Sequence, residues 1–193
     1  MKKEFLKKQY KESFTYIWEC KKPIFYIILI FLLFVLIGFF LPVPQALSSE
    51  IMKYIQELLK KTEGFGFGDM FSFIFLNNLK TSFFGMIFGV LFGVFPVFNS
   101  LANGYILGFV ASKSVLEQGI SVLWRIFPHG IFELPAVFIA LGVGLKLGTF
   151  FLADYKKRFL KENLRNSLRV FVLIILPLLA IAALIESLLI LFS

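Results

Sequence analysis

The sequence is poor in charged residues, and long stretches of it contain none. Charged side chains make up 17% of the 193 residues, whereas an average soluble domain has about 25%. No charged residue occurs from 23 to 45 or from 81 to 112, and 59% of the chain is hydrophobic. A helix needs roughly 20 apolar residues to cross the hydrocarbon of a bilayer. The composition therefore excludes an ordinary soluble protein and predicts an all-α integral membrane protein.

Cysteine and histidine are equally scarce, since the chain has one of each, Cys20 and His129. A single cysteine excludes an intramolecular disulfide and a cysteine-built metal site. A zinc protease would need a second histidine in the pattern H-E-x-x-H, whereas His129 stands in H-G-I-F-E. No serine lies in G-x-S-x-G. We expect no catalytic residue, metal site or cofactor, and hence not an enzyme.

Five hydrophobic spans are expected, at 23–42, twice within 70–112, at 128–151 and at 170–192. Polar residues interrupt the 70–112 region, namely Asn77, Asn78, Lys80, Asn99 and Asn103. This region is barely long enough for two ordinary spans with a turn at Pro96–Ser100. A broken or re-entrant pair fits as well, because irregular backbone is tolerated where it is buried or lines a cavity. The prediction is about five transmembrane helices, the second and third either spanning or re-entrant.

Two amphipathic segments lie outside these spans. In 1–22 and in 45–62, apolar residues recur at helical spacing with charged residues between them. Such helices lie in the membrane interface. We therefore predict two interfacial helices and a single transmembrane bundle domain over 23–193.

Lysine and arginine predict the orientation of the chain. Segment 1–22 holds seven of them and the loop predicted at 152–169 holds six, against three in 42–69. Cytoplasmic loops are the ones enriched in these residues. The sequence thus predicts a multi-pass cell-membrane protein with a cytoplasmic amino terminus and an extracytoplasmic carboxyl terminus. The net charge of +8 is expected to contact anionic membrane lipids and not nucleic acid.

Glycine recurs at every fourth residue in three places. These glycines are Gly85, Gly89 and Gly93, then Gly104 and Gly108, then Gly144 and Gly148. Spacing of this kind lets helix backbones approach closely. We predict tight helix packing there, either within the bundle or between protomers of a homo-oligomer, with a dimer favoured.

Ionisable groups inside a membrane are costly and are functional candidates by default. His129 and Glu133 stand four residues apart and so share one helix face. They are expected either to pin the start of the fourth span against a polar break at Asn99–Asn103 or to form a proton or substrate site. Glu186, deep in the last span, needs a partner, and Lys146, Lys80, His129 or the asparagines could supply one.

Four stretches of the sequence resemble the stage II sporulation protein M family of membrane proteins. They read "NNLKTSFFGMIFGVLFGVFP", "NGYILG", "PHGIFELPAVFIALGVGLKLG" and "AALIE", and the resemblance is collinear from about residue 10 to the end. In endospore-forming bacteria, the resemblance implies a partner that anchors two wall-degrading proteins during engulfment and is not itself the hydrolase.

Two functions follow as alternatives. The first is a non-enzymatic scaffold or assembly protein that binds other membrane or envelope proteins through its basic cytoplasmic face and the helix at 45–62. The second is a transporter or channel for a small solute, ion or lipid, with a polar cavity at the broken 70–112 region. The two differ in whether the polar residues of the spans are needed for function or only for folding.

Overall fold

The structure is a computed structural model, which describes the backbone of residues 2–192 and the side chains of residues 3–123 and 133–191. Within this part the regular elements are all helical, and no strand occurs. The long helices are α1 (Lys2–Glu19), α2 (Lys21–Phe40), α3 (Gln45–Thr62), α4 (Phe67–Ile87), α5 (Val94–Gln118), α6 (Leu123–Gly148), α7 (Lys156–Val170) and α8 (Leu176–Phe192). Short segments η1 (Phe88–Val90), η2 (Ile120–Val122), η3 (Thr149–Leu152) and the π-helical η4 (Phe171–Ile175) join some of them.

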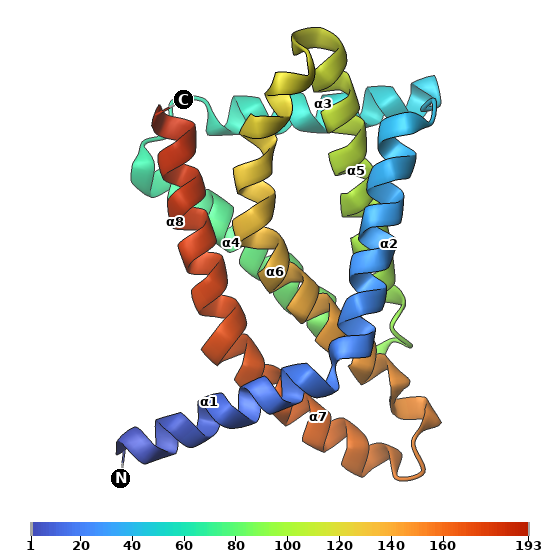
Figure 1. Cartoon of the computed structure of the whole chain (residues 1–193), viewed down its shortest axis with the longest axis vertical. Coiled ribbons are helices and arrows are strands. Elements are labelled where there is room, and N and C mark those ends of the chain that lie inside the picture. Colours follow the sequence, from blue (N-terminus) through green and yellow to red (C-terminus); the bar gives the residue numbers. More distant parts are fainter. Residues whose placement is uncertain (1, 193) are drawn as a thin grey trace.

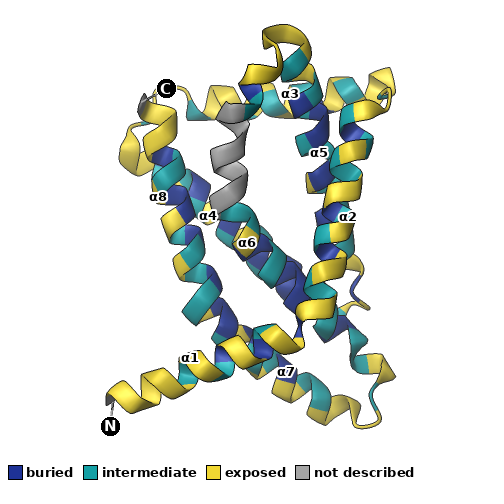
Figure 2. Cartoon of the chain, in the orientation of Figure 1, coloured by how far each residue is buried: buried dark blue, intermediate teal, exposed yellow. Residues whose placement is uncertain are grey.

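Five helical stretches in the described residues are long and apolar enough to cross a membrane. They are Lys21–Phe40, Phe67–Val90, Val94–Gln118, Glu133–Leu152 and Lys156–Leu191. Their outward faces expose large apolar side chains, such as Leu29, Leu33 and Leu36 of α2, each more than half exposed (Figure 2). Such faces are stable in hydrocarbon and not in water. The predicted all-α membrane fold with five spans is confirmed.

The bundle has two distinct ends, each covered by amphipathic helices (Figure 1). Helices α1 and α7 contact one another at one end. Helix α3 crosses the opposite end, near the carboxyl terminus of α8. The bounds of α1 and α3 agree with the two predicted amphipathic segments. The basic segments 1–22 and 152–169 therefore share one end, opposite the helix at 45–62.

Helix α6 is the central element, because it contacts α2, α4, α5 and α8. Its buried face consists of small and branched residues three or four positions apart, including the fully buried Ala136, Ala140 and Val143. The small residues on this face let neighbouring helices approach closely.

Glycine brings α4 and α6 into backbone contact. A methyl group built on Gly89 would lie under 3.0 Å from the carbonyl of Gly144. The same holds for Gly144 against the carbonyl of Gly85, and for Gly148 against the backbone of Gly93. Larger residues would separate the two helices.

A second pair of glycines brings α5 against α2. Methyl groups on Gly104 and Gly108 would lie under 3.0 Å from the carbonyls of Phe31 and Val35, and one on Gly38 would meet the carbonyl of Tyr105. The structure thus places the repeated glycines at contacts within one chain.

The turn between the second and third spans lies earlier than predicted. The chain reverses at Leu91–Gly93, where Phe92 and Gly93 have φ of 55° and 72°, so the prediction of a turn at Pro96–Ser100 is wrong. Pro96 lies in the first turn of α5, where the missing N–H costs nothing because that group has no intrahelical partner. Asn99 and Asn103 consequently stand on a regular helix and not at a backbone break.

Two further boundaries differ from the predictions. Helix α6 begins at Leu123, so Pro128 does not start the fourth span. Most of the predicted loop at 152–169 is helix α7, which turns Asn163, Ser167 and Val170 inward. This segment was predicted to be a loop because basic residues occupy its other face.

Pro177 is accommodated at the beginning of α8, directly after the π-helical η4. Proline cannot donate to the carbonyl four residues earlier and crowds it. A π-helical turn shifts the hydrogen-bond register by one residue. This allows α7, η4 and α8 to continue as one path from the interface into the bundle.

The Gly108→Ala variant should lower the thermal stability of the detergent-solubilised protein strongly, because its methyl group would clash with the backbone of Val35. Overpacking of this kind costs about 1–3 kcal/mol. Gly68→Ala is the matched control, since nothing lies within 4 Å of that position and alanine favours a helix. The thermal unfolding of both variants is followed by the loss of helical circular dichroism on heating. Equal midpoint temperatures for the two variants would contradict the close contact between Gly108 and the backbone of Val35.

Candidate functional site

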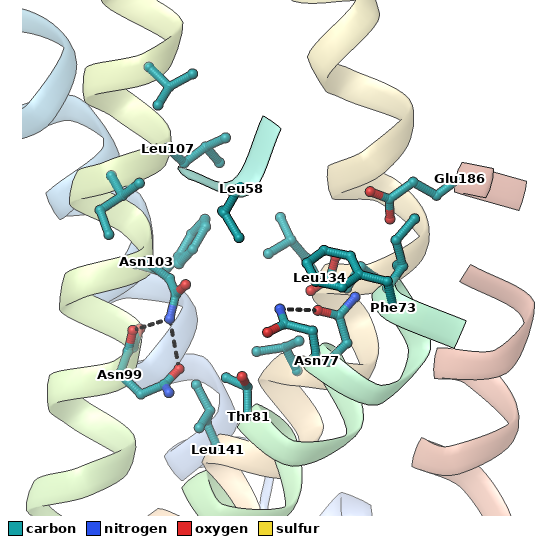
Figure 3. A pocket seen from close by; sticks show the side chains of 18 residues that line it. Leu58, Phe73, Asn77, Thr81, Asn99, Asn103, Leu107, Leu134, Leu141 and Glu186 are labelled. Carbon is teal, nitrogen blue, oxygen red and sulfur yellow. Dashed lines mark hydrogen bonds between the residues drawn. The ribbon is translucent and has the colours of Figure 1, made fainter. Parts of the chain in front are cut away.

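A cavity of about 430 Å³ lies inside the bundle, walled chiefly by α4, α5 and α6 (Figure 3). Phe31 of α2 and Glu186 of α8 complete the walls, and Leu58 of α3 reaches in from the end of the bundle. The volume is within the range of about 300–1,000 Å³ that is typical of small-molecule sites.

The lining of the cavity is amphipathic. Eight of its described side chains are polar, namely Asn77, Asn78, Thr81, Asn99, Ser100, Asn103, Glu133 and Glu186. The other lining residues are apolar, with Phe31 and Phe73 as the aromatic ones. Polar groups cost free energy at membrane depth unless they are hydrogen-bonded, so their concentration around one space requires an explanation.

Two asparagine pairs face each other across the cavity (Figure 3). On α5, the Nδ2 of Asn103 donates to the Oδ1 of Asn99 at 3.0 Å and to its carbonyl at 2.9 Å. On α4, the Nδ2 of Asn77 donates to the Oδ1 of Asn78 at 3.4 Å. Each pair therefore orients its own amides, and the two pairs present hydrogen-bonding groups from opposite walls.

Both arms of the α4–α5 hairpin contact α6, but their closest backbone contacts at glycine are with different helices. Helix α4 is held against α6 by the Gly85–Gly144 contact, whereas α5 is held against α2 by Gly108. A buried hydrogen bond from the Oγ of Ser100 to the carbonyl of Ile27, at 2.8 Å, adds to the α5–α2 contact. The polar faces of α4 and α5 consequently stay apart.

Glu133 and Glu186 bring two carboxyl groups to the same cavity, from α6 and α8. Helix α6 begins before Glu133, so Glu133 does not lie at the helix terminus, and its predicted role in pinning the fourth span stays a prediction. His129 lies outside the residues whose side chains are described, and its predicted pairing with Glu133 stays a prediction.

Neither Lys146 nor Lys80, the two lysines of the predicted polar cluster, lines the cavity. The Nζ of Lys146 donates to the Oε2 of Glu19 at 2.9 Å, at the α1 end of the bundle, so Lys146, one of the candidate partners of Glu186, pairs with another residue. Lys80 is exposed on α4. Of the predicted polar cluster, the structure brings together the four asparagines and the two glutamates.

A separate polar network ties α1 and α7 to the bundle. The hydroxyl of Tyr16 donates to the Oδ1 of Asn163 at 3.0 Å and lies 3.3 Å from the Oγ of Ser167. Burial raises the pKa of Tyr16 well above its usual value, so the hydroxyl stays a donor. Arg169 of α7 pairs with Glu12 of α1. We call α1 and α7, held in this way, the basal platform.

Five polar residues of these two sites were not predicted from the sequence, namely Thr81 and Ser100 in the cavity and Tyr16, Asn163 and Ser167 in the basal platform. Thr81 stands four residues after Asn77, and Ser167 four after Asn163, so helical spacing was the available signal. Among the described side chains, no group of three or more His, Cys, Asp or Glu residues could hold a metal ion.

Comparison with known proteins places the chain in a family. A family model described as Stage II sporulation protein M matches residues 27–189, so the chain belongs to this family, as its motifs predicted. It is similar to "Uncharacterized protein MJ0793" of Methanocaldococcus jannaschii, with 33% identity over 122 residues, 60% of this chain and 68% of the relative. It is also similar to "Uncharacterized protein MJ0706" of that organism, with 27% identity over 191 residues, 96% of this chain and 85% of the relative. No solved structure matches the chain.

A cysteine in place of Thr81 should react with a small methanethiosulfonate reagent, because this side chain borders the cavity. Ser82→Cys is the matched control, since the neighbouring Ser82 is 0% exposed and should stay unlabelled. Cys20 should not interfere, because burial raises the pKa of its thiol to about 11 and the thiol form is unreactive near neutral pH. Equal labelling rates at the two positions would mean that the cavity does not admit the reagent.

Proposed function

We propose that this member of the stage II sporulation protein M family binds a small amphiphilic solute in its central cavity and carries it across the membrane, without catalysing a reaction. The observation that carries the proposal is the cavity itself, with asparagine pairs on facing walls at membrane depth. Ionisable side chains within membrane spans, such as Glu133 and Glu186 here, are candidates for a functional site by default.

The cost of the polar lining supports binding over simple packing. If the bundle needed only stability, apolar residues at these positions would avoid the free-energy cost of polar side chains at membrane depth. The asparagine pairs use part of their hydrogen-bonding capacity on one another, and a ligand can use the rest.

Helix α3 supports passage, because it covers the cavity while holding few contacts with the bundle. Ile51 is its one buried residue, Leu58 lines the cavity, and the Nζ of Lys61 lies 5.2 Å from the ring centroid of Phe73. Segments with little buried apolar surface open at low free energy. A displaced α3 would connect the cavity with the adjacent aqueous phase.

A carrier should expose the cavity to each side of the membrane in turn. In the Asn103→Cys variant, a membrane-impermeant methanethiosulfonate should therefore label the cysteine both in right-side-out and in inside-out vesicles, with Ser82→Cys as the unlabelled control. Labelling from one side alone would contradict transport across the membrane, and the cavity would then be only a binding pocket. The absence of labelling from both sides would favour a scaffold.

The scaffold function remains the second candidate, and the basal platform favours it. Its exposed faces carry lysines from both helices, including Lys8, Lys11 and Lys161, and the Lys146–Glu19 ion pair fixes the platform to α6. A rigid basic surface of this kind suits an acidic segment of a partner protein. On this view the platform binds the partner and the cavity plays no part.

The basal platform is proposed to face the cytoplasm, because it holds most of the lysine and arginine residues that govern orientation. An impermeant thiol reagent added to intact cells should label Lys53→Cys on α3 and spare Lys161→Cys on α7. Both lysines are exposed residues of amphipathic helices, so they form a matched pair. Labelling of Lys161→Cys but not of Lys53→Cys would show that the chain has the opposite orientation in the membrane.

A further inference from the structure

The two facing asparagine pairs have a specific chemical consequence for the ligand of the proposed carrier. We propose that they select an uncharged polar group that both donates and accepts hydrogen bonds, such as an amide or a hydroxyl-bearing group, attached to an apolar body. This inference rests on the proposed function, since it names the class of molecule that the same cavity binds.

Amide side chains recognise such groups through matched donors and acceptors. Each asparagine offers two N–H donors and a carbonyl oxygen with two lone pairs. In the α5 pair, the Nδ2 of Asn103 is already used by Asn99, so the Oδ1 of Asn103 and the Nδ2 of Asn99 are the groups not engaged in the bonds between them. In the α4 pair, the Oδ1 of Asn77 and the Nδ2 of Asn78 are the groups not engaged in the bond between them.

Each pair therefore keeps one donor group and one acceptor group that its internal bond does not use. A planar amide, or a pair of neighbouring hydroxyls, satisfies such a set from both sides at once. Internal bonding within each pair holds the amides in place before the ligand arrives, which lowers the entropy lost on binding.

Charge complementarity disfavours an ionic ligand. An anion would meet the two glutamates at the cavity wall and, among the described lining residues, no basic side chain. For a cation the glutamates are the natural partners, and they reach the cavity from α6 and α8, whereas the asparagine pairs stand on α4 and α5. An ion left without a partner at membrane depth is strongly destabilised.

The apolar body of the ligand would lie against the remaining walls. Phe31 and Phe73 supply aromatic rings, and Leu107 and Val137 supply aliphatic surface. Burial of apolar surface there would contribute most of the binding free energy, and the asparagines would decide which polar group is accepted.

Three probes of similar shape and different charge test the inference. They are the neutral benzamide, the cation benzamidinium and the anion benzoate. The measurement is the rate at which methanethiosulfonate labels the Thr81→Cys variant in nanodiscs. Benzamide should slow the labelling at concentrations where the two ions do not. Asn99→Leu should weaken this protection about two- to tenfold, which is the effect of losing one hydrogen bond.

Asn99→Asp provides the positive control, because a carboxylate at this wall should shift the preference from benzamide to the benzamidine cation. Best protection by benzamidine or benzoate in the unsubstituted cavity would overturn the ligand class and leave the carrier proposal standing. Labelling that none of the three probes slows, at any soluble concentration, would also overturn the ligand class. Failure of the Thr81→Cys variant to be labelled at all would instead remove the cavity on which both proposals rest.

Discussion

Backbone contact at glycine is the constraint on which the rest of this structure depends. Without a hydrophobic driving force between helices in lipid, close packing and interhelical hydrogen bonds must hold a bundle together. Here the contact between Gly85 and Gly144 holds α4 on α6, and Gly108 holds α5 on the backbone of α2. The closest backbone contacts of the two hairpin arms are thus with different helices, and their polar faces line the cavity from opposite sides.

The polar side chains are organised at two depths, and each set has a different consequence. In the cavity, the asparagines bond within their own helices and leave capacity for a ligand. In the basal platform, Tyr16 bonds Asn163 across two helices, and Lys146 binds Glu19. The first set leaves groups available inside the membrane, whereas the second consumes them to fix two interfacial helices beneath the bundle.

Much of the fold could be predicted from the sequence, because hydrophobic length and helical spacing are local properties. The amphipathic helix at 45–62 and the number of spans were predicted correctly for that reason. The turn at Pro96–Ser100 was not, since proline is as compatible with the first turn of a helix as with a bend, and only Phe92 and Gly93 adopt the positive φ that reverses the chain. Lys146 was one of several candidate partners for Glu186, because spacing along a chain does not show which helix ends meet.

The sequence by itself determined that this is a five-span membrane protein of the stage II sporulation protein M family, and which residues are too polar for lipid. Only the tertiary structure decided that the four asparagines and Glu133 and Glu186 line one space, and that Lys146 joins the basal platform instead. The physical reason is that composition and periodicity are set within a helix, whereas a cavity depends on how closely different helices approach, and that distance is set by backbone contacts between residues far apart in the chain.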